Sequence, residues 1–255
     1  MAILWENSFA NADYSVRSAG SSIRLYRNGV HHSQWNPRRP LNGSVWDLLS
    51  IPAALRPDLS AGRVLILGFG AGAVARQLDC CFQATSITGV EIDPVHLSIA
   101  RGFFECGDSY QYIQGDAVQW IDSADEQWDY IIDDLYGDSE TALGEPFRTA
   151  PLDETWFLKL SDRLSRNGIL VLNDLDPQSV QNLPPFNSSK LRGSFQTALQ
   201  LSIEGYDNRA VAFCRCPYAE EVFYSRLRQI LRPFSRSSQV LARYQIQELR
   251  IGSFA

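Results

Sequence analysis

Acidic side chains gather where an apolar segment ends, in the stretch WDYIIDDLYGD at residues 128–138. A carboxylate at a strand end can orient or deprotonate an amine or a hydroxyl, or it can simply accept backbone N–H groups in a turn. Because side chains alternate along a strand, Asp133 and Asp134 should point to opposite sides. We expect Asp134 to face a ligand and Asp133 to face away. For Asp138 both interpretations stay open.

A glycine-rich turn, GFGAGA at residues 68–73, follows the apolar run RVLIL and precedes a helical pattern. Gly68, Gly70 and Gly72 lack a Cβ atom, so the turn can approach a ligand closely. The first N–H groups of the following helix would also be unpaired. Tight packing of a strand against a helix explains the same glycines, so this turn alone decides nothing.

The next predicted strand favours a ligand. The segment GVEID ends in Glu91 and Asp93, about twenty residues after the glycines, where dinucleotide-binding folds carry an acid that accepts hydrogen bonds from ribose hydroxyls. We assign this role to Glu91, because Asp93 followed by Pro94 is typical of a helix N-cap.

A third strand end carries Gly115-Asp116, with Ala117 starting a short amphipathic segment. An acid there can accept a hydrogen bond from an adenine amino group. Ala73 completes a relaxed nicotinamide dinucleotide fingerprint as well, but that fold has no particular need for an acid at residue 116. The three strand ends in this order are typical of class I S-adenosylmethionine-binding domains. We place S-adenosylmethionine, or its decarboxylated form, against Gly68, Gly70, Gly72, Glu91, Asp116, Ala117 and Asp134.

Apolar runs alternate with helical patterns from residue 63 onward, which predicts a mostly parallel sheet with helices on both faces. The expected strands are 63–70, 86–93, 110–116, 128–134, 168–174, 199–205 and 209–216. Among the expected helices are 71–82, 94–104, 117–124, 150–164, 188–199 and 219–234. The predicted fold class is α/β, with a Rossmann-like, doubly wound, seven-stranded sheet of the class I methyltransferase type.

The first 45 residues differ, because they alternate only loosely between apolar and polar residues. Asn28-Gly29 between two such runs is a strong hairpin signal. We expect an N-terminal β-hairpin unit at residues 1–45 and a Rossmann-like catalytic domain at residues 46–255. His31 and His32 should face opposite sides of their strand, so we expect no metal site there.

The composition indicates which classes of partner the protein is not expected to bind. The formal net charge of −6 argues against a general nucleic-acid or anionic-membrane binder, and no apolar run approaches the ~18 residues of a membrane span. The five cysteines form neither a zinc nor a disulfide pattern, and residues 1–14 do not have the pattern of a signal peptide. These features are typical of a cytoplasmic protein with reduced thiols.

The segments RVLILGFGAGAVARQL, GVEIDP, IQGDAVQWI and WDYIIDDLYGD resemble the spermidine synthase (aminopropyltransferase) branch of the class I superfamily. The resemblance implies an enzyme with a decarboxylated S-adenosylmethionine cosubstrate, a polyamine acceptor and a homodimeric or tetrameric assembly, of which we expect the homodimer. It implies that Glu91 binds ribose, Asp116 binds adenine, and Asp134 helps to deprotonate the attacking amine. Tyr206 falls where the family has a tyrosine that lines the acceptor pocket.

The acceptor half departs from the family pattern. Ala71 stands where the family's glycine loop has an Asp for the amino group of the aminopropyl chain, and Gly137 replaces the second Asp of the fourth-strand loop. Val45-Trp46 replaces a Tyr–His pair, and the acid that follows is kept as Asp47. A polycationic acceptor would lose anionic partners through these changes, and unpaired buried charges are costly.

The sequence therefore favours methyl transfer to a small-molecule acceptor by a spermidine synthase-like transferase. Aminopropyl transfer to a polyamine is the first alternative, and a non-catalytic nucleoside-binding scaffold is the second. A nicotinamide dehydrogenase is a distant third. Candidate acceptor-side residues are His32, which replaces a family Gln, and Trp46, Asp47, Tyr136, Asp138 and Tyr206.

Overall fold

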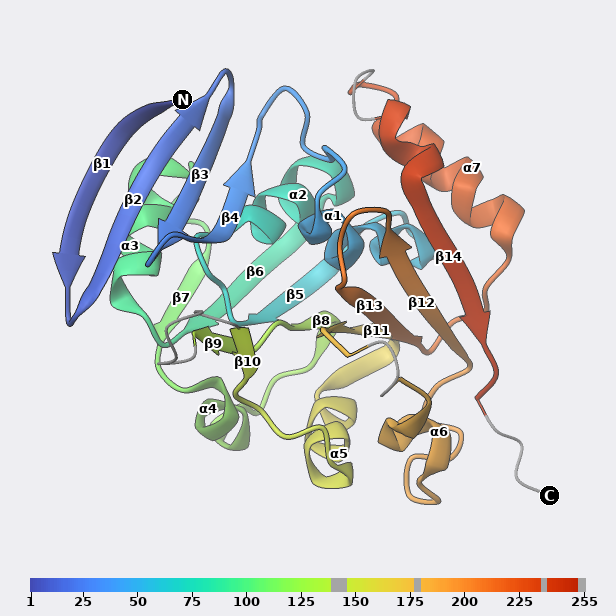
Figure 1. The fold of residues 1–255 in the computed structure, drawn as a ribbon. Coiled ribbons are helices and arrows are strands. Elements are labelled where there is room, and N and C mark those ends of the chain that lie inside the picture. The colour runs from blue at the N-terminus through green and yellow to red at the C-terminus, as the bar shows by residue number, and fades with distance from the viewer. Residues whose placement is uncertain (139–145, 177–179, 235–237, 252–255) are drawn as a thin grey trace.

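The computed structural model describes residues 1–138, 146–176, 180–234 and 238–251. Its centre is an eight-stranded sheet of order β14-β12-β13-β11-β8-β5-β6-β7 (Figure 1). Its strands are β5 (Gly62–Leu67), β6 (Ala84–Glu91), β7 (Gln111–Gln114), β8 (Trp128–Asp133), β11 (Leu164–Asp174), β12 (Thr197–Ile203), β13 (Arg209–Cys214) and β14 (Tyr244–Leu249). The strands from β7 to β11 in this order pair in parallel, whereas β12, β13 and β14 pair antiparallel. The predicted fold class is confirmed, but β14 makes the sheet eight-stranded rather than seven-stranded.

Helices cover both faces of this sheet (Figure 1). They are α1 (Val45–Ser50), α2 (Ala73–Phe82), α3 (Pro94–Phe103), α4 (Ala117–Ser123), α5 (Glu154–Asp162), α6 (Pro184–Asn187) and α7 (Glu220–Leu231), with short 3₁₀ turns at Ile51–Leu55, Val180–Asn182 and Ser238–Arg243. Alternation along β5 sends Val64 and Ile66 into a core shared with α1, α2, α3 and α7. Leu65 and Leu67 enter a second core shared with α4, α5 and α6.

The N-terminal unit is a four-stranded antiparallel sheet of β1 (Ala2–Phe9), β2 (Ala12–Ala19), β3 (Ser22–Arg27) and β4 (Val30–Trp35). The expected hairpin forms at Asn28-Gly29, where both residues have positive φ and Arg27 pairs with Val30. The pairing of β3 with β4 shifts by one residue at His32, so this strand contains a bulge.

The helix expected at residues 188–199 is not formed. Residues 197–203 belong to β12 instead, and Gly193 has a φ of +74°, which no helix continues through. Leu191, Phe195 and Ala198 suggested a helical spacing because all three are buried in the second core. A separate two-stranded sheet is formed by β9 (Tyr136–Asp138) and β10 (Pro146–Arg148).

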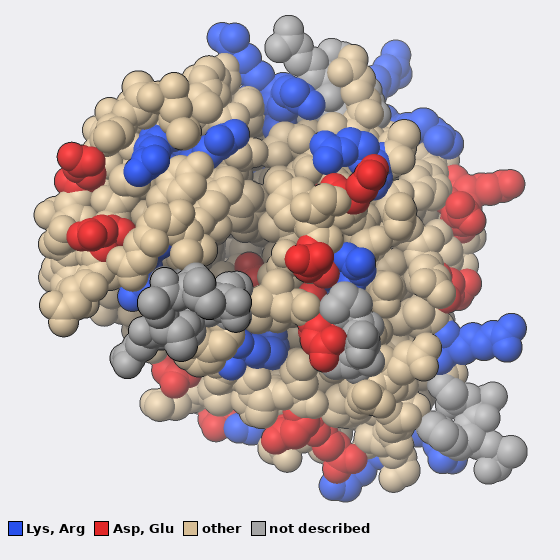
Figure 2. Space-filling model, in the orientation of Figure 1, with Lys and Arg blue, Asp and Glu red and all other residues tan. Residues whose placement is uncertain are grey.

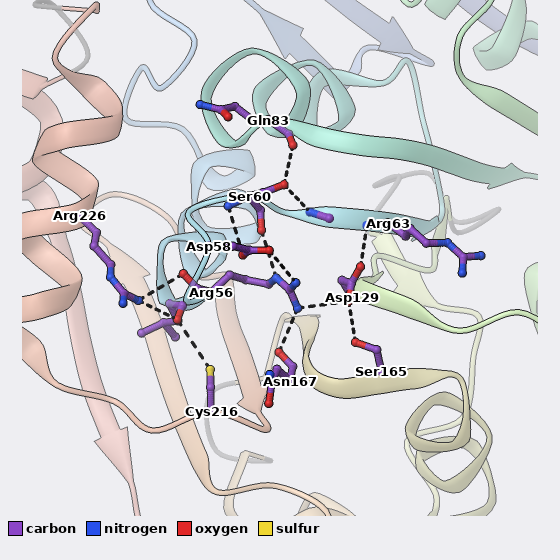
Figure 3. A network of polar contacts seen from close by, with 12 residues as sticks. Arg56, Asp58, Ser60, Arg63, Gln83, Asp129, Ser165, Asn167, Cys216 and Arg226 are labelled. Atoms are coloured by element: carbon purple, nitrogen blue, oxygen red, sulfur yellow. Dashed lines mark hydrogen bonds and ion pairs between the residues drawn. The ribbon is translucent and has the colours of Figure 1, made fainter.

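A polar network fixes the amino-terminal edge of the sheet (Figure 3). The buried Arg56 guanidinium donates to the carbonyl oxygens of Ser60 and Asn167 and lies 3.3 Å from the Asp129 carboxylate. Asp129, at the start of β8, also accepts the N–H of Arg63 in β5. Burial raises the pKa of Asp129, but these donors and cations outweigh it and leave the pKa below its usual value. The network therefore holds the starts of β5 and β8 together.

Candidate functional site

A cavity of about 740 Å³ opens at the carboxyl ends of the parallel strands, where the N-terminal sheet meets the central sheet. Figure 2 shows a hollow beside the N-terminal sheet. The topology brings the predicted strand ends to this one edge, as expected for parallel strands. Of the predicted site residues, those lining the cavity are Gly68, Gly70, Glu91, Asp116, Ala117, Asp134, His32, Trp46, Tyr136 and Tyr206.

The glycine turn joins β5 to α2. Gly68 has a φ of +84°, and a Cβ atom there would overlap the carbonyl oxygen of Asp134. The turn therefore passes close to the end of β8 only because residue 68 is glycine. Gly72 differs from the prediction: it is the N-cap of α2, it packs against Phe69 and Cys106, and it does not line the cavity.

Glu91 ends β6 with a buried carboxylate held by two backbone donors. Gly70 N–H donates to Oε2 (2.6 Å), and Asp93 N–H donates to Oε1 (2.9 Å). Burial by itself raises the pKa of Glu91, but these donors and the neighbouring His96 outweigh it, so the pKa lies below its usual value. An ionised carboxylate with one donor on each oxygen keeps lone pairs for two hydroxyl groups.

Asp116 lies at the start of α4. Its Oδ1 accepts the N–H of Val118 (2.8 Å), so it caps the helix, and the residue also lines the cavity beside Ala117. Ile92 is 68% exposed and lines the same cavity. An apolar side chain and a carboxylate in one cavity suit a flat base with an exocyclic amino group.

Asp134 faces the cavity from the end of β8. Its Oδ1 accepts a hydrogen bond from Asn173 Nδ2 (2.7 Å), and Asn173 Oδ1 accepts one from Asn208 Nδ2 (3.2 Å). Burial, together with the charges of Asp133 and Glu91, raises the pKa of Asp134 to about 6. A carboxylate with this pKa can take a proton near neutral pH. Sequence reasoning missed Asn173, although it stands at the end of a predicted strand.

Asp133 points away from the cavity, as strand alternation predicts. It is 1% exposed, and its Oδ2 accepts hydrogen bonds from Trp156 Nε1 (2.7 Å) and from the Arg148 guanidinium. The two adjacent acids therefore have different partners on different sides of the sheet. The side chain of Asp138 lies outside the described residues.

Aromatic side chains line other parts of the cavity. The Tyr136 hydroxyl donates to the carbonyl oxygen of Asn173 (3.1 Å), and burial raises its pKa to about 12. Tyr206 is 39% exposed. Trp46 makes an edge contact with the His31 ring at a centroid distance of 4.9 Å. Burial lowers the pKa of His31 to about 4, so this imidazole is neutral at pH 7.

The strict alternation on which the expectation for His31 and His32 rested is interrupted by the bulge in β4. Both residues line the cavity. His31 pairs with Tyr26 and Ser33 pairs with Leu25, so His32 is the extra residue of β4 at the bulge. A bulge of this kind leaves no signal in a single sequence.

Asp47 does not reach the cavity. It is fully buried, and its carboxylate accepts hydrogen bonds from Gln77 Nε2 (2.8 Å), the Tyr244 hydroxyl (2.7 Å) and the N–H of Gly43 (2.6 Å). Burial raises its pKa to about 6 despite these donors. The prediction of an acceptor-side role is therefore corrected: Asp47 holds α2 and the start of β14 to the segment before α1.

His96 is a cavity residue that the sequence did not single out. It lies in the first turn of α3, is 6% exposed and contacts both Glu91 and Asp93. Its only sequence signal is a polar residue within the apolar pattern of residues 94–104. Within the described ranges, no group of His, Cys, Asp and Glu side chains could hold a metal ion. No helix in the same ranges is long and apolar enough to cross a membrane.

Comparisons with known proteins agree with this architecture. No protein-family model matches the chain. It is 29% identical over 133 residues to a probable polyamine aminopropyl transferase of Bifidobacterium longum, which covers 52% of this chain and 28% of that protein. It is 31% identical over 110 residues to a polyamine aminopropyltransferase of Neisseria meningitidis serogroup A, covering 42% of this chain and 40% of that protein. The chain thus spans less than half the length of both relatives.

The fold is similar to a probable spermidine synthase from Corynebacterium glutamicum, with a TM-score of 0.69 and 16% identity. That match covers 98% of this chain and 91% of the other, so it includes the N-terminal sheet. This likeness shows a shared fold, and the two sequence matches are to proteins named for aminopropyl transfer.

Proposed function

We propose that this protein is an alkyltransferase that moves the aminopropyl group of decarboxylated S-adenosylmethionine to an amine. The observation that carries the proposal is the position of Asp134. Its carboxylate lies in the same cavity as Glu91 and Asp116, and its pKa of about 6 suits the removal of a proton from an amine. The sequence relatives are named for aminopropyl transfer, and this reverses our preference for methyl transfer.

The residues fit such a donor. A volume of about 740 Å³ lies within the range of sites for small ligands and cofactors. Glu91 would accept hydrogen bonds from the ribose hydroxyls, and Asp116 would accept one from the adenine amino group. The glycine turn would let the sulfonium end approach Asp134, because Gly68 brings the turn against the end of β8.

In the reaction, the acceptor nitrogen attacks the carbon bonded to the positive sulfur. A nitrogen–carbon bond forms, the carbon–sulfur bond breaks, and the pair of electrons leaves with sulfur to give a neutral thioether. Asp134 takes the proton that the nitrogen loses. The Asn173 amide holds Oδ1 of Asp134 by a hydrogen bond of 2.7 Å, which leaves Oδ2 for the amine. Alignment of nucleophile and leaving group supplies most of the remaining acceleration.

Methyl transfer is the second candidate, and Ala71 favours it. Ala71 stands where the family has an Asp for the aminopropyl amine, it is fully buried, and it does not line the cavity. The chain therefore lacks that carboxylate contact in its glycine turn. An intact methionine carboxylate would meet no charge repulsion from this position.

The nucleoside product separates the candidates. The protein would be incubated with an amine panel and either donor, and the products would be identified by mass spectrometry. Aminopropyl transfer releases methylthioadenosine from the decarboxylated donor, whereas methyl transfer releases S-adenosylhomocysteine from S-adenosylmethionine. Nucleoside binding by calorimetry without either product would favour the non-catalytic scaffold. Binding of NAD alone would contradict the proposal. We also propose a homodimer, which sedimentation velocity would test.

A further inference from the structure

His96 lies beside Glu91, the proposed ribose-binding acid, and has no role in the proposed reaction. Its Nδ1 is 3.9 Å from Glu91 Oε1, and its Nε2 is 3.7 Å from Asp93 Oδ2. These are ion-pair distances rather than hydrogen bonds. Among the residues that the structure describes, none forms a hydrogen bond with the buried Nε2 of His96. A buried imidazole without a close hydrogen-bond partner is unusual, so a structural or functional cause is expected.

Asp93 does not supply that reason, because stronger partners already hold it. The Tyr14 hydroxyl donates to Asp93 Oδ2 (2.7 Å), and Val95 N–H donates to Oδ1 (2.8 Å). Arg27 lies 3.6 Å from Oδ2 as well. Asp93 therefore caps α3 and ties it to β2 and β3. Glu91 is the carboxylate assigned to the ribose, so the contact of His96 with Glu91 is the one that bears on the proposed nucleoside site.

Side chains of the N-terminal sheet also lie beside His96. The His32 ring, from the bulge in β4, lies 5.3 Å from the His96 ring, and Tyr14 meets His96 edge-on at 6.0 Å. His96 is thus enclosed between the N-terminal sheet and the end of β6. Its ring lies beside the Glu91 carboxylate, and its polar edge favours the ionised form of that group.

We propose that His96 is a positioning residue that keeps Glu91 turned toward the ribose hydroxyls, with His32 and Tyr14 holding its ring in place. This inference rests on the proposed nucleoside site. It predicts that His96 matters only for ligands with ribose hydroxyls. A residue with a purely structural role would affect all nucleosides equally.

Calorimetry with adenosine and 2′,3′-dideoxyadenosine tests the inference. The His96→Phe variant should bind adenosine about tenfold more weakly and dideoxyadenosine with unchanged affinity. His96→Asn should keep more of the discrimination, because its amide nitrogen can replace Nδ1. Ser98→Ala, on the exposed side of the same helix, is the matched control and should bind both like the wild type.

A double-mutant cycle with Glu91→Gln supplies the second readout. If His96 acts through Glu91, His96→Phe should change adenosine affinity no further in the Glu91→Gln background. Additive losses, or equal weakening of both nucleosides, would overturn the inference and leave the proposed function standing. Failure of the wild-type protein to bind adenosine would instead remove the nucleoside site itself. Melting curves confirm that each variant is folded.

Discussion

At the scale of single residues, Asp134 is the group on which the proposed chemistry depends. Replacement by Asn keeps its size and the contact with Asn173 but removes the base. We expect Asp134→Asn to lower kcat by about 10²–10⁴-fold, the usual contribution of a positioned general base. Affinity for methylthioadenosine should be nearly unchanged, because the proposed nucleoside contacts are those of Glu91 and Asp116. Steady-state kinetics and calorimetry measure the two effects. An Asp134→Asn variant with full turnover would remove this residue from the chemistry.

The raised pKa of Asp134 gives a second prediction, with opposite signs for rate and stability. The carboxylate must be ionised to act as a base, so kcat/KM should fall as the pH drops below about 6. The folded protein binds this proton more tightly than the unfolded chain, whose Asp has its ordinary lower pKa. The contribution of Asp134 to the free energy of unfolding is therefore fully present at acidic pH and is lost as the pH rises through about 6.

Asp134→Asn should consequently be more stable than the wild type at pH 7 and lose that advantage at pH 4. Thermal melting at both pH values provides the measurement. This combination of lost activity and gained stability is typical of catalytic groups held in unfavourable surroundings. Equal melting temperatures of the two proteins at pH 7 would contradict the burial argument.

At the scale of elements, the glycine turn between β5 and α2 allows a sharp test. A Cβ atom at Gly68 would overlap the backbone of Asp134, and the residue has a φ of +84°. Gly68→Ala should therefore separate the turn from the end of β8, weaken nucleoside binding and cost more than the ~1–2 kcal/mol of a left-handed residue alone. Gly205→Ala is the control, because its φ is +90° but its Cβ would lie in open space.

The network at the opposite edge of the sheet should matter for stability alone. Arg56 is buried and contacts both Asp129 and two carbonyl oxygens, so Arg56→Leu leaves several polar groups unpaired. We expect a loss of about 3–5 kcal/mol in the free energy of unfolding, measured by urea denaturation. The exposed carboxylate of Asp58 also lies 3.4 Å from the Arg56 guanidinium and gives the control: Asp58→Ala should change stability by less than about 1 kcal/mol. Neither variant should alter nucleoside affinity in the folded protein.

The strands and helices that could be predicted from sequence are those that bury one or both of their faces. Continuous apolar runs identified the parallel strands, and Asn28-Gly29 identified a hairpin. By contrast, β1 has exposed residues at almost every position, so no burial pattern marks it. The edge strand β14 is likewise half exposed, and its pairing with β12 is a long-range contact. The false helix at 188–199 arose because burial in an irregular segment imitated a helical spacing.

At the scale of the whole molecule, the site is a meeting of two units. The Rossmann-like unit provides the strand-end acids, which the sequence predicted because parallel strands end at one edge. The N-terminal sheet provides His31, His32 and Tyr14. The positions of these side chains depend on the bulge in β4 and on the packing of this sheet against the central sheet, and no local sequence pattern encodes either. This explains why the cavity residues at the strand ends could be predicted more completely than those from the N-terminal sheet.

The charge of the cavity as a whole bears on the acceptor. Among the described residues, the carboxylates that line it are Glu91, Asp93, Asp116 and Asp134. Asp93 is held by Tyr14 and Arg27, and Glu91 and Asp116 are assigned to the nucleoside. Asp134 alone is then left in this set for an acceptor amine. A second ammonium group on the acceptor would have no carboxylate of this set to pair with.

Because one carboxylate of this set is left for the acceptor, we expect no strong preference between a monoamine and a diamine. One substitution should change this. The wild type should use propylamine and 1,3-diaminopropane with similar kcat/KM. Gly137→Asp restores an acid at the place where the family has one, and it should raise the preference for the diamine about tenfold, which is ~1.4 kcal/mol. The new side chain needs only small shifts of Thr149 and Phe147, both exposed. Gly137→Asn has nearly the same volume without charge and should leave the preference unchanged. A wild-type protein that already prefers the diamine strongly would show that the acceptor finds a carboxylate other than Asp134.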